Sequence, residues 1–310
     1  NKFFYVNDLD DEEILNLSLE NKIDIAIYRA GLTVNARSSI FSKKIAPIQV
    51  NFLGYQGTTG QEGIDYIVAD EYVIQQNQEN FYTEKIIYLP GSYFPRDNNR
   101  IIGKKKFTRK DLKISENSFV FCNFNNSYKI TSEEFEIWMK LLQKIDNSIL
   151  LLLETNNEMK TNLYFEAEKF KINDDRIVFI KKTIFEDHLS RHSLADLFLD
   201  TFNYNAHTTA VDALWTGLPI ITKPGNSFSS RVCGSLLKFF DLDELILKNK
   251  DEYYNKALEL AENPHKLKAI KNKIVKHRDS NKYFDPKNYT LNLEKAYKKI
   301  HAMRVNENKF

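Results

Sequence analysis

Short apolar runs alternate with longer amphipathic stretches through the second half of the chain, and this alternation constrains the fold more than any other feature. Each run is bounded by polar or turn-forming residues, which is typical of a buried strand. Buried strands that are separated by helices form parallel sheets. We expect such strands at residues 118–124, 147–154, 176–181, 195–201 and 218–225.

The first half carries the same signal in shorter runs. Strands are predicted there at residues 23–28, 46–55, 64–70 and 85–90. A chain of 310 residues exceeds the size at which a single core usually keeps growing. We therefore predict an α/β protein of two Rossmann-like lobes facing a cleft, with ligands at the carboxyl ends of the strands.

A polar and basic stretch separates the two series of strands. Residues 95–113 read PRDNNRIIGKKKFTRKDLK, which is the best linker candidate in the sequence. Its lysines are expected to form a solvated surface. We predict a first lobe with this linker over residues 1–112, a second lobe over 113–285 and a C-terminal helix over 286–310.

Two helices in the second half have recognisable starts. Thr131 and Glu134 form a capping box in front of an amphipathic run that carries Trp138. A second helix is expected from about His207 to Thr216. Because the first turn of a helix has unpaired N–H groups and partial positive charge, a phosphate is a natural ligand there. From these residues alone, Thr208 is equally well an ordinary helix cap.

The composition argues against several classes of protein. The 44 basic and 42 acidic residues leave a net charge of +2, which indicates no general affinity for nucleic acid or for a membrane. Cys122 and Cys233 are too few for a disulfide framework and lack metal-ligand spacing. This cysteine usage fits a cytoplasmic protein. No apolar run approaches the length that spans a bilayer.

The segment NAHTTAVDALWTGLPIIT, together with PGNSFSSRVCGSLL, resembles the donor-binding signature of glycosyltransferase family 41, the O-GlcNAc transferases, in a bacterial-type form. Matching motifs such as CNFNNSYKIT and APIQVNFLGYQGTTG extend the resemblance over nearly the whole chain. It implies a GT-B fold and an inverting enzyme that moves GlcNAc from UDP-GlcNAc to Ser or Thr of proteins without a metal or other cofactor. The family's opening segment and its tetratricopeptide repeats have no counterpart in this sequence, so an incomplete first lobe is expected.

The resemblance also implies a set of donor-site residues. Lys129 matches the lysine that contacts the donor diphosphate, Tyr128 matches its neighbouring tyrosine, and Asn126 stands where the family has a glutamine. The contacts of the second helix with phosphate and ribose fall on His207, Thr208, Thr209 and Asp212.

The nucleobase contacts of the family match His188 and Arg191. His192, four residues after His188, is expected to be solvated. Phe185 stands where the family has a lysine that also approaches the base. The glycine-rich loop of the first lobe implies a cleft wall formed by Gln49, Tyr55 and Thr58.

Two other functions remain open at this point. One is a transferase of the same family with another donor, GDP-fucose or UDP-glucose; the HTT motif followed by Asp212 favours UDP-GlcNAc, because the fucosyl branch resembles GTTTTxE there. The other is a non-catalytic module that binds a nucleotide sugar or a protein. The expected partners are a nucleotide sugar and a protein acceptor, with no nucleic acid and no membrane.

Overall fold

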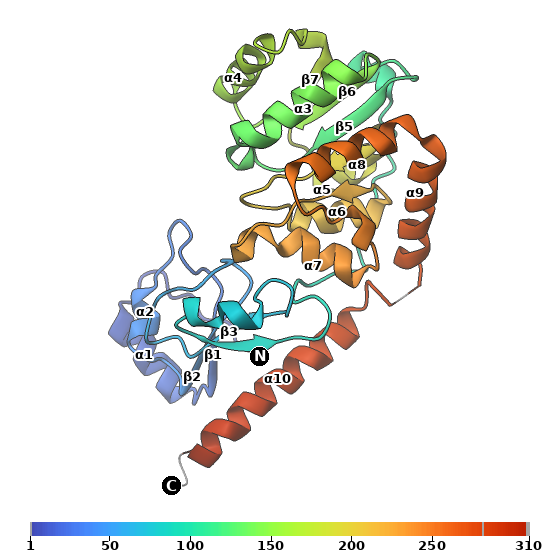
Figure 1. Ribbon diagram of the computed structural model, residues 1–310. Helices are drawn as coiled ribbons and strands as arrows, with labels where there is room; N and C mark the ends of the chain where they lie inside the picture. The colour runs from blue at the N-terminus through green and yellow to red at the C-terminus, as the bar shows by residue number, and fades with distance from the viewer. Residues whose placement is uncertain (1, 281, 308–310) are drawn as a thin grey trace. The chain divides into compact units, whose positions relative to one another are not determined.

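The computed structural model describes residues 2–280 and 282–307, and the chain divides into two compact units (Figure 1). The second unit is Arg96–Asp285, and the first combines the residues up to Pro95 with those from Pro286 onward. The predicted boundary at residue 112 therefore falls inside the second unit. The predicted C-terminal helix belongs to the first.

The first unit is built around a four-stranded parallel sheet with the strand order β1-β2-β3-β4. Each strand lies within one of the predicted apolar runs, so these four predictions are confirmed. The strands are β1 (Ile25–Tyr28), β2 (Ile48–Asn51), β3 (Tyr66–Ala69) and β4 (Lys85–Tyr88). The α-helices are α1 (Asp11–Glu20), α2 (Ser39–Ser42) and α10 (Pro286–Glu307).

The second unit holds a five-stranded parallel sheet with the order β7-β6-β5-β8-β9. All five strands fall in predicted runs, which confirms the α/β prediction. They are β5 (Phe119–Asn123), β6 (Ser148–Leu153), β7 (Ile177–Ile180), β8 (Leu197–Leu199) and β9 (Ile220–Ile221). The helices are α3 (Ser132–Lys144), α4 (Asn157–Glu168), α5 (Phe185–Ser190), α6 (Thr208–Thr216), α7 (Val232–Phe239), α8 (Lys250–Glu262) and α9 (Pro264–Arg278).

Helix α3 shows why these sequences form a packed layer. Its start is the predicted capping box, since the N–H of Thr131 donates to Glu134 Oε1 at 2.8 Å. Phe135, Trp138 and Met139 are buried along one face, as their helical spacing predicts. The apolar strand β6, whose six residues are all buried, completes this part of the core.

The segment between the two predicted lobes is a fixed part of the second unit, so the prediction of a linker is wrong. Arg96 is buried and donates from Nε to the carbonyl of Tyr283 at 2.9 Å. Arg109 donates to the carbonyl of Ser118 at 2.7 Å and pairs with Asp196 at 2.8 Å. These arginines satisfy carbonyl and carboxylate groups that the sequence pattern does not reveal.

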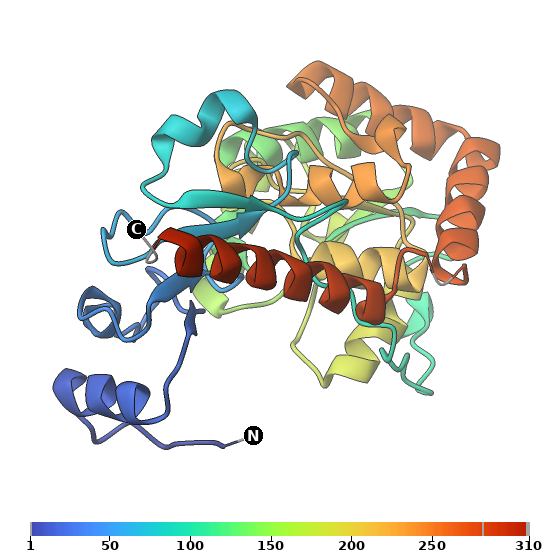
Figure 2. The ribbon, with the colours of Figure 1, turned by 90° about the horizontal axis from the view of Figure 1, so that it is seen from below.

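Helix α10 closes the first unit from the far end of the sequence (Figure 2). The hydroxyl of Tyr289 donates to the carbonyl of Tyr93 at 2.6 Å. Nearer the end of the helix, Ile300 is buried and His301 Nε2 lies 3.8 Å from Asp24 Oδ1. None of the helices in the described part of the chain is both long and apolar enough to cross a membrane.

Candidate functional site

The order of the second sheet reverses between β5 and β8, which pair directly. The loops that follow two such strands open a crevice in doubly wound sheets, and ligands bind there. Here Asn125 joins the two loops: its Nδ2 donates to Thr201 Oγ1 at 3.2 Å, and its Oδ1 accepts the hydroxyl of Thr209 at 2.6 Å. The loop after β5 and the start of α6 are therefore held together by a buried amide.

Lys129 lies at the centre of this arrangement. Its Nζ donates to the carbonyl of Asn205 at 2.9 Å and lies 4.0 Å from the ring centroid of Tyr204. Burial lowers the pKa of Lys129 to about 8, while the nearby Asp200 carboxylate works in the opposite direction. At neutral pH this lysine is still mostly protonated, and an anionic ligand would strengthen that charge state.

Asp200 shapes the loop that precedes α6, and the sequence analysis missed it. Its carboxylate accepts the N–H of Thr201 at 2.8 Å, the N–H of Ala206 at 2.6 Å and the hydroxyl of Thr222 at 2.6 Å. Burial raises the pKa of Asp200 to about 6, and these bonds together with Lys129 oppose the rise. An acidic residue directly after a buried strand is the signal that could have identified it.

Helix α6 begins with His207 as its N-cap, so the alternative that Thr208 is the cap is wrong. The ring of His207 stacks on Tyr204 with centroids 4.7 Å apart, and its Nε2 lies 3.0 Å from the carbonyl of Ser229. Burial, and then Lys129, lower the pKa of His207 to about 3, so the ring is neutral and carries its proton on Nε2. Thr208 is exposed at the first helical position, where its backbone N–H points out of the helix start.

Asp212 lies one turn further along α6, and its carboxylate is almost entirely buried. It forms an ion pair with Arg100 through Oδ1, while Oδ2 lies 4.0 Å from His188 Nε2. Burial raises the pKa of Asp212 to about 6, and Arg100 opposes the rise. Arg100 is a second residue that the sequence analysis missed, since it stands 112 positions before its partner.

His188 is oriented by Arg191. The guanidinium Nε and Nη2 lie 3.2 Å and 2.9 Å from His188 Nδ1, so this nitrogen accepts and the ring proton sits on Nε2, toward Asp212. Burial, reinforced by Arg191, lowers the pKa of His188 to about 4. His192 is only 2% exposed and donates from Nδ1 to the carbonyl of His188 at 2.8 Å. The prediction of a solvated His192 is therefore wrong, because its ring packs against Phe124.

Two predicted site residues that neighbour Lys129 in the sequence are exposed. Asn126 is exposed, and Tyr128 is 73% exposed, although it is adjacent to Lys129. The amide that does join the two loops is Asn125, one position earlier than the residue that the resemblance implied.

The three residues expected in a cleft wall belong to the first unit. Gln49 is 0% exposed, and its amide donates to the carbonyls of Phe41 at 2.7 Å and Gly63 at 2.5 Å. It is an interior side chain, contrary to its predicted place in a wall. Thr58 donates to Glu84 at 2.6 Å, and Tyr55 is half-buried.

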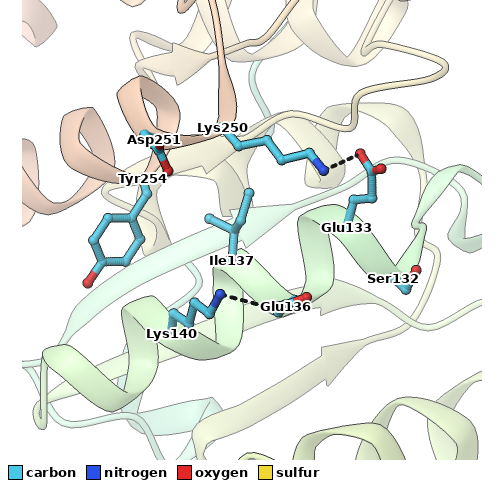
Figure 3. A pocket seen from close by; sticks show the side chains of 8 residues that line it. All are labelled: Ser132, Glu133, Glu136, Ile137, Lys140, Lys250, Asp251 and Tyr254. Atoms are coloured by element: carbon cyan, nitrogen blue, oxygen red, sulfur yellow. Dashed lines mark hydrogen bonds and ion pairs between the residues drawn. The ribbon is translucent and has the colours of Figure 1, made fainter.

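A cavity of about 310 Å³ lies elsewhere in the second unit, between α3 and α8 (Figure 3). Four of its charged side chains are paired, Lys250 with Glu133 at 3.1 Å and Lys140 with Glu136 at 2.6 Å. None of the candidate site residues described above, such as Lys129, His188 and Asp212, lines this cavity. Within residues 2–280 and 282–307, no three His, Cys, Asp or Glu side chains are grouped so as to hold a metal ion.

Comparison with known proteins gives a consistent result. The sequence profile of glycosyl transferase family 41 matches residues 13–107 and 104–293. A probable UDP-N-acetylglucosamine–peptide N-acetylglucosaminyltransferase of Arabidopsis thaliana is 36% identical over 306 residues, covering 96% of this chain and 31% of the relative. A UDP-N-acetylglucosamine–peptide N-acetylglucosaminyltransferase of Caenorhabditis elegans is 26% identical, covering 89% of this chain and 34% of the relative.

Among solved structures, a mutant O-GlcNAc transferase of Thermobaculum terrenum superposes with a TM-score of 0.88 at 25% identity. The match covers 97% of this chain and 57% of that one. The two parallel-sheet units are those of a GT-B glycosyltransferase. The chain thus spans about a third of the length of the two relatives and just over half of the solved structure.

Proposed function

The chain belongs to glycosyl transferase family 41, and from that membership we propose that it carries the donor site of an inverting transferase that moves GlcNAc from UDP-GlcNAc to Ser or Thr of proteins. One observation carries the proposal: Lys129 and His188 come from separate segments, and both lie against α6 or the loop before it, in the unit whose sheet reverses its order between β5 and β8. A nucleoside diphosphate has the anionic and hydroxyl groups that these residues match.

The diphosphate end of the donor would lie at Lys129 and the first turn of α6. Negative charge builds up on the leaving diphosphate as the bond to the sugar breaks. A partly buried cation and helix N–H groups that are already oriented toward that charge stabilise it without reorganisation. We propose that these groups replace a metal ion as the counter-charge.

The nucleoside end would lie at Asp212 and His188. Oδ2 of Asp212 can accept a bond from a ribose hydroxyl. The neutral ring of His188, fixed by Arg191, offers an N–H on the same side and a flat face to a base. The protein acceptor and a cytoplasmic setting belong to the same proposal; the two buried free thiols, Cys122 and Cys233, fit a reducing compartment.

Calorimetric titration of the chain with UDP, UDP-GlcNAc and GDP tests the proposal. UDP and UDP-GlcNAc should bind, and GDP should bind more weakly. Lys129→Met should weaken UDP binding about tenfold or more, since a charge-assisted phosphate contact is typically worth about 1.5–3 kcal/mol. The matched control is Lys140→Met, which removes an exposed lysine from α3 of the same unit. Equal UDP affinity in Lys129→Met and the control would remove Lys129 from the site.

A further inference from the structure

The segment of residues 96–105 runs against the helices that carry the candidate nucleoside contacts. Trp215 Nε1 donates to the carbonyl of Arg100 at 3.0 Å, and the N–H of Gly103 donates to the carbonyl of Glu186 at 2.9 Å. A Cβ at Gly103 would lie 2.9 Å from the backbone of Glu186, so the close approach depends on glycine at this position. These bonds hold Arg100 between α5 and α6.

The guanidinium of Arg100 has donors to spare. It pairs with Asp212 Oδ1, and the two side chains are only 10% and 6% exposed. Its central carbon lies 5.5 Å from the ring centroid of Phe185, within the range of a cation–π contact. Arg100 Nε is buried and finds no hydrogen-bond partner among the described residues. Buried donors are nearly always satisfied, so an unpaired one beside a candidate site calls for a ligand or an ordered water.

The ion pair with Arg100 leaves one carboxylate oxygen of Asp212 available to a ligand. A carboxylate has two oxygens, and Oδ2, 4.0 Å from His188 Nε2, remains directed toward the nucleoside end of the site. Arg100 thus neutralises and orients the carboxylate on one side while its remaining N–H groups lie next to the place of the nucleoside. The cation proposed for the diphosphate end is Lys129, which donates to the carbonyl of Asn205 in the loop before α6, so Arg100 is not needed there.

We propose that Arg100 is a specificity-determining residue that donates hydrogen bonds to the oxygen acceptors of the nucleoside, on the base or the ribose, of the bound nucleoside diphosphate. The inference rests on the proposed function, which places the nucleoside beside Asp212 and His188. A planar guanidinium favours carbonyl-rich bases such as uracil, because all its N–H groups are donors and none can accept.

The test compares UDP with inorganic pyrophosphate, which has the diphosphate but no nucleoside, by calorimetry on the 310-residue chain. Arg100→Met should weaken UDP binding about tenfold or more and leave pyrophosphate binding unchanged. Lys129→Met should weaken both. Arg100→Lys keeps the charge beside Asp212 but has fewer donors, so it should retain the fold and still bind UDP several-fold more weakly. Lys106→Met, an exposed lysine of the same basic run, is the matched control and should change neither affinity.

The possible outcomes separate the two proposals. If the unchanged chain fails to bind UDP, the proposed function is overturned and this inference with it. If the unchanged chain binds UDP but Arg100→Lys binds it equally well or more tightly, only the role of Arg100 is overturned. A parallel loss of UDP and pyrophosphate binding in both Arg100 variants would likewise overturn it, since Arg100 would then act through the fold of the site.

Discussion

Lys129 makes the candidate site sensitive to pH in a defined direction. Its pKa is lowered to about 8 by burial, and a bound diphosphate favours its protonated form. Above pH 8 the free chain must therefore take up a proton when it binds UDP, and the affinity should fall by up to about tenfold per pH unit. Below pH 8 the lysine is already charged, and its contribution levels off.

Calorimetry between pH 7.5 and 9.5 measures this slope, since the phosphates of UDP, with a second pKa of about 6, are ionised throughout. Lys129→Arg is the informative variant, because a guanidinium stays charged across the range and should flatten the slope. A profile that is flat in the unchanged chain would contradict the predicted role of the lysine ammonium.

For single residues, the sequence predicted those side chains whose place follows from the helix or strand next to them in the chain. His207 and Asp212 are placed on the predicted helix, and Lys129 follows the predicted strand. Arg100 and Asp200 could not be predicted in the same way, because their roles depend on which distant loops the sheet order brings together. His192 was also mispredicted, because its ring is buried in the core rather than solvated.

Among the helices and strands, α3 allows a direct test of whether its predicted capping box contributes to stability. Thr131 donates its hydroxyl to the carboxylate of Glu134, a buried group whose pKa is raised by desolvation. Thr131→Ala removes this bond and should lower the free energy of unfolding by about 0.5–2 kcal/mol, whereas Thr131→Ser keeps the hydroxyl and should cost little.

Urea unfolding followed by tryptophan fluorescence measures the effect in the right part of the molecule. Trp138 and Trp215, the two tryptophans of the chain, both lie in the second unit. Their signal therefore follows that unit alone. Equal stability of the alanine and serine variants would show that the capping box contributes nothing measurable.

The strands were predictable because each is a short apolar run with turn residues at its ends. The order of the strands in the sheet could not be predicted, because β5 and β8 pair across 76 positions. An apolar run shows that a strand is present but not which strand it pairs with. The segment 96–112 was misread for a related reason. Its polar composition resembles that of a linker, yet Arg96 and Arg109 bind carbonyl groups that become available only in the folded unit.

For the molecule as a whole, we predict that donor binding needs no divalent cation. The counter-charge of the diphosphate would come from Lys129 and from α6, both within the second unit. UDP affinity measured in EDTA should therefore match the affinity measured with Mg²⁺ or Mn²⁺. Binding that disappears in EDTA and returns with either metal would contradict this prediction.

The return of α10 to the first unit also sets an order of events during synthesis. Within this chain, residues 2–95 leave the ribosome before the second unit, yet α10, the helix that packs with them in the first unit, comes only after the whole second unit. Domains generally fold as they emerge. We therefore expect the second unit to complete its fold before the first unit, whose four strands are made earlier but wait for α10.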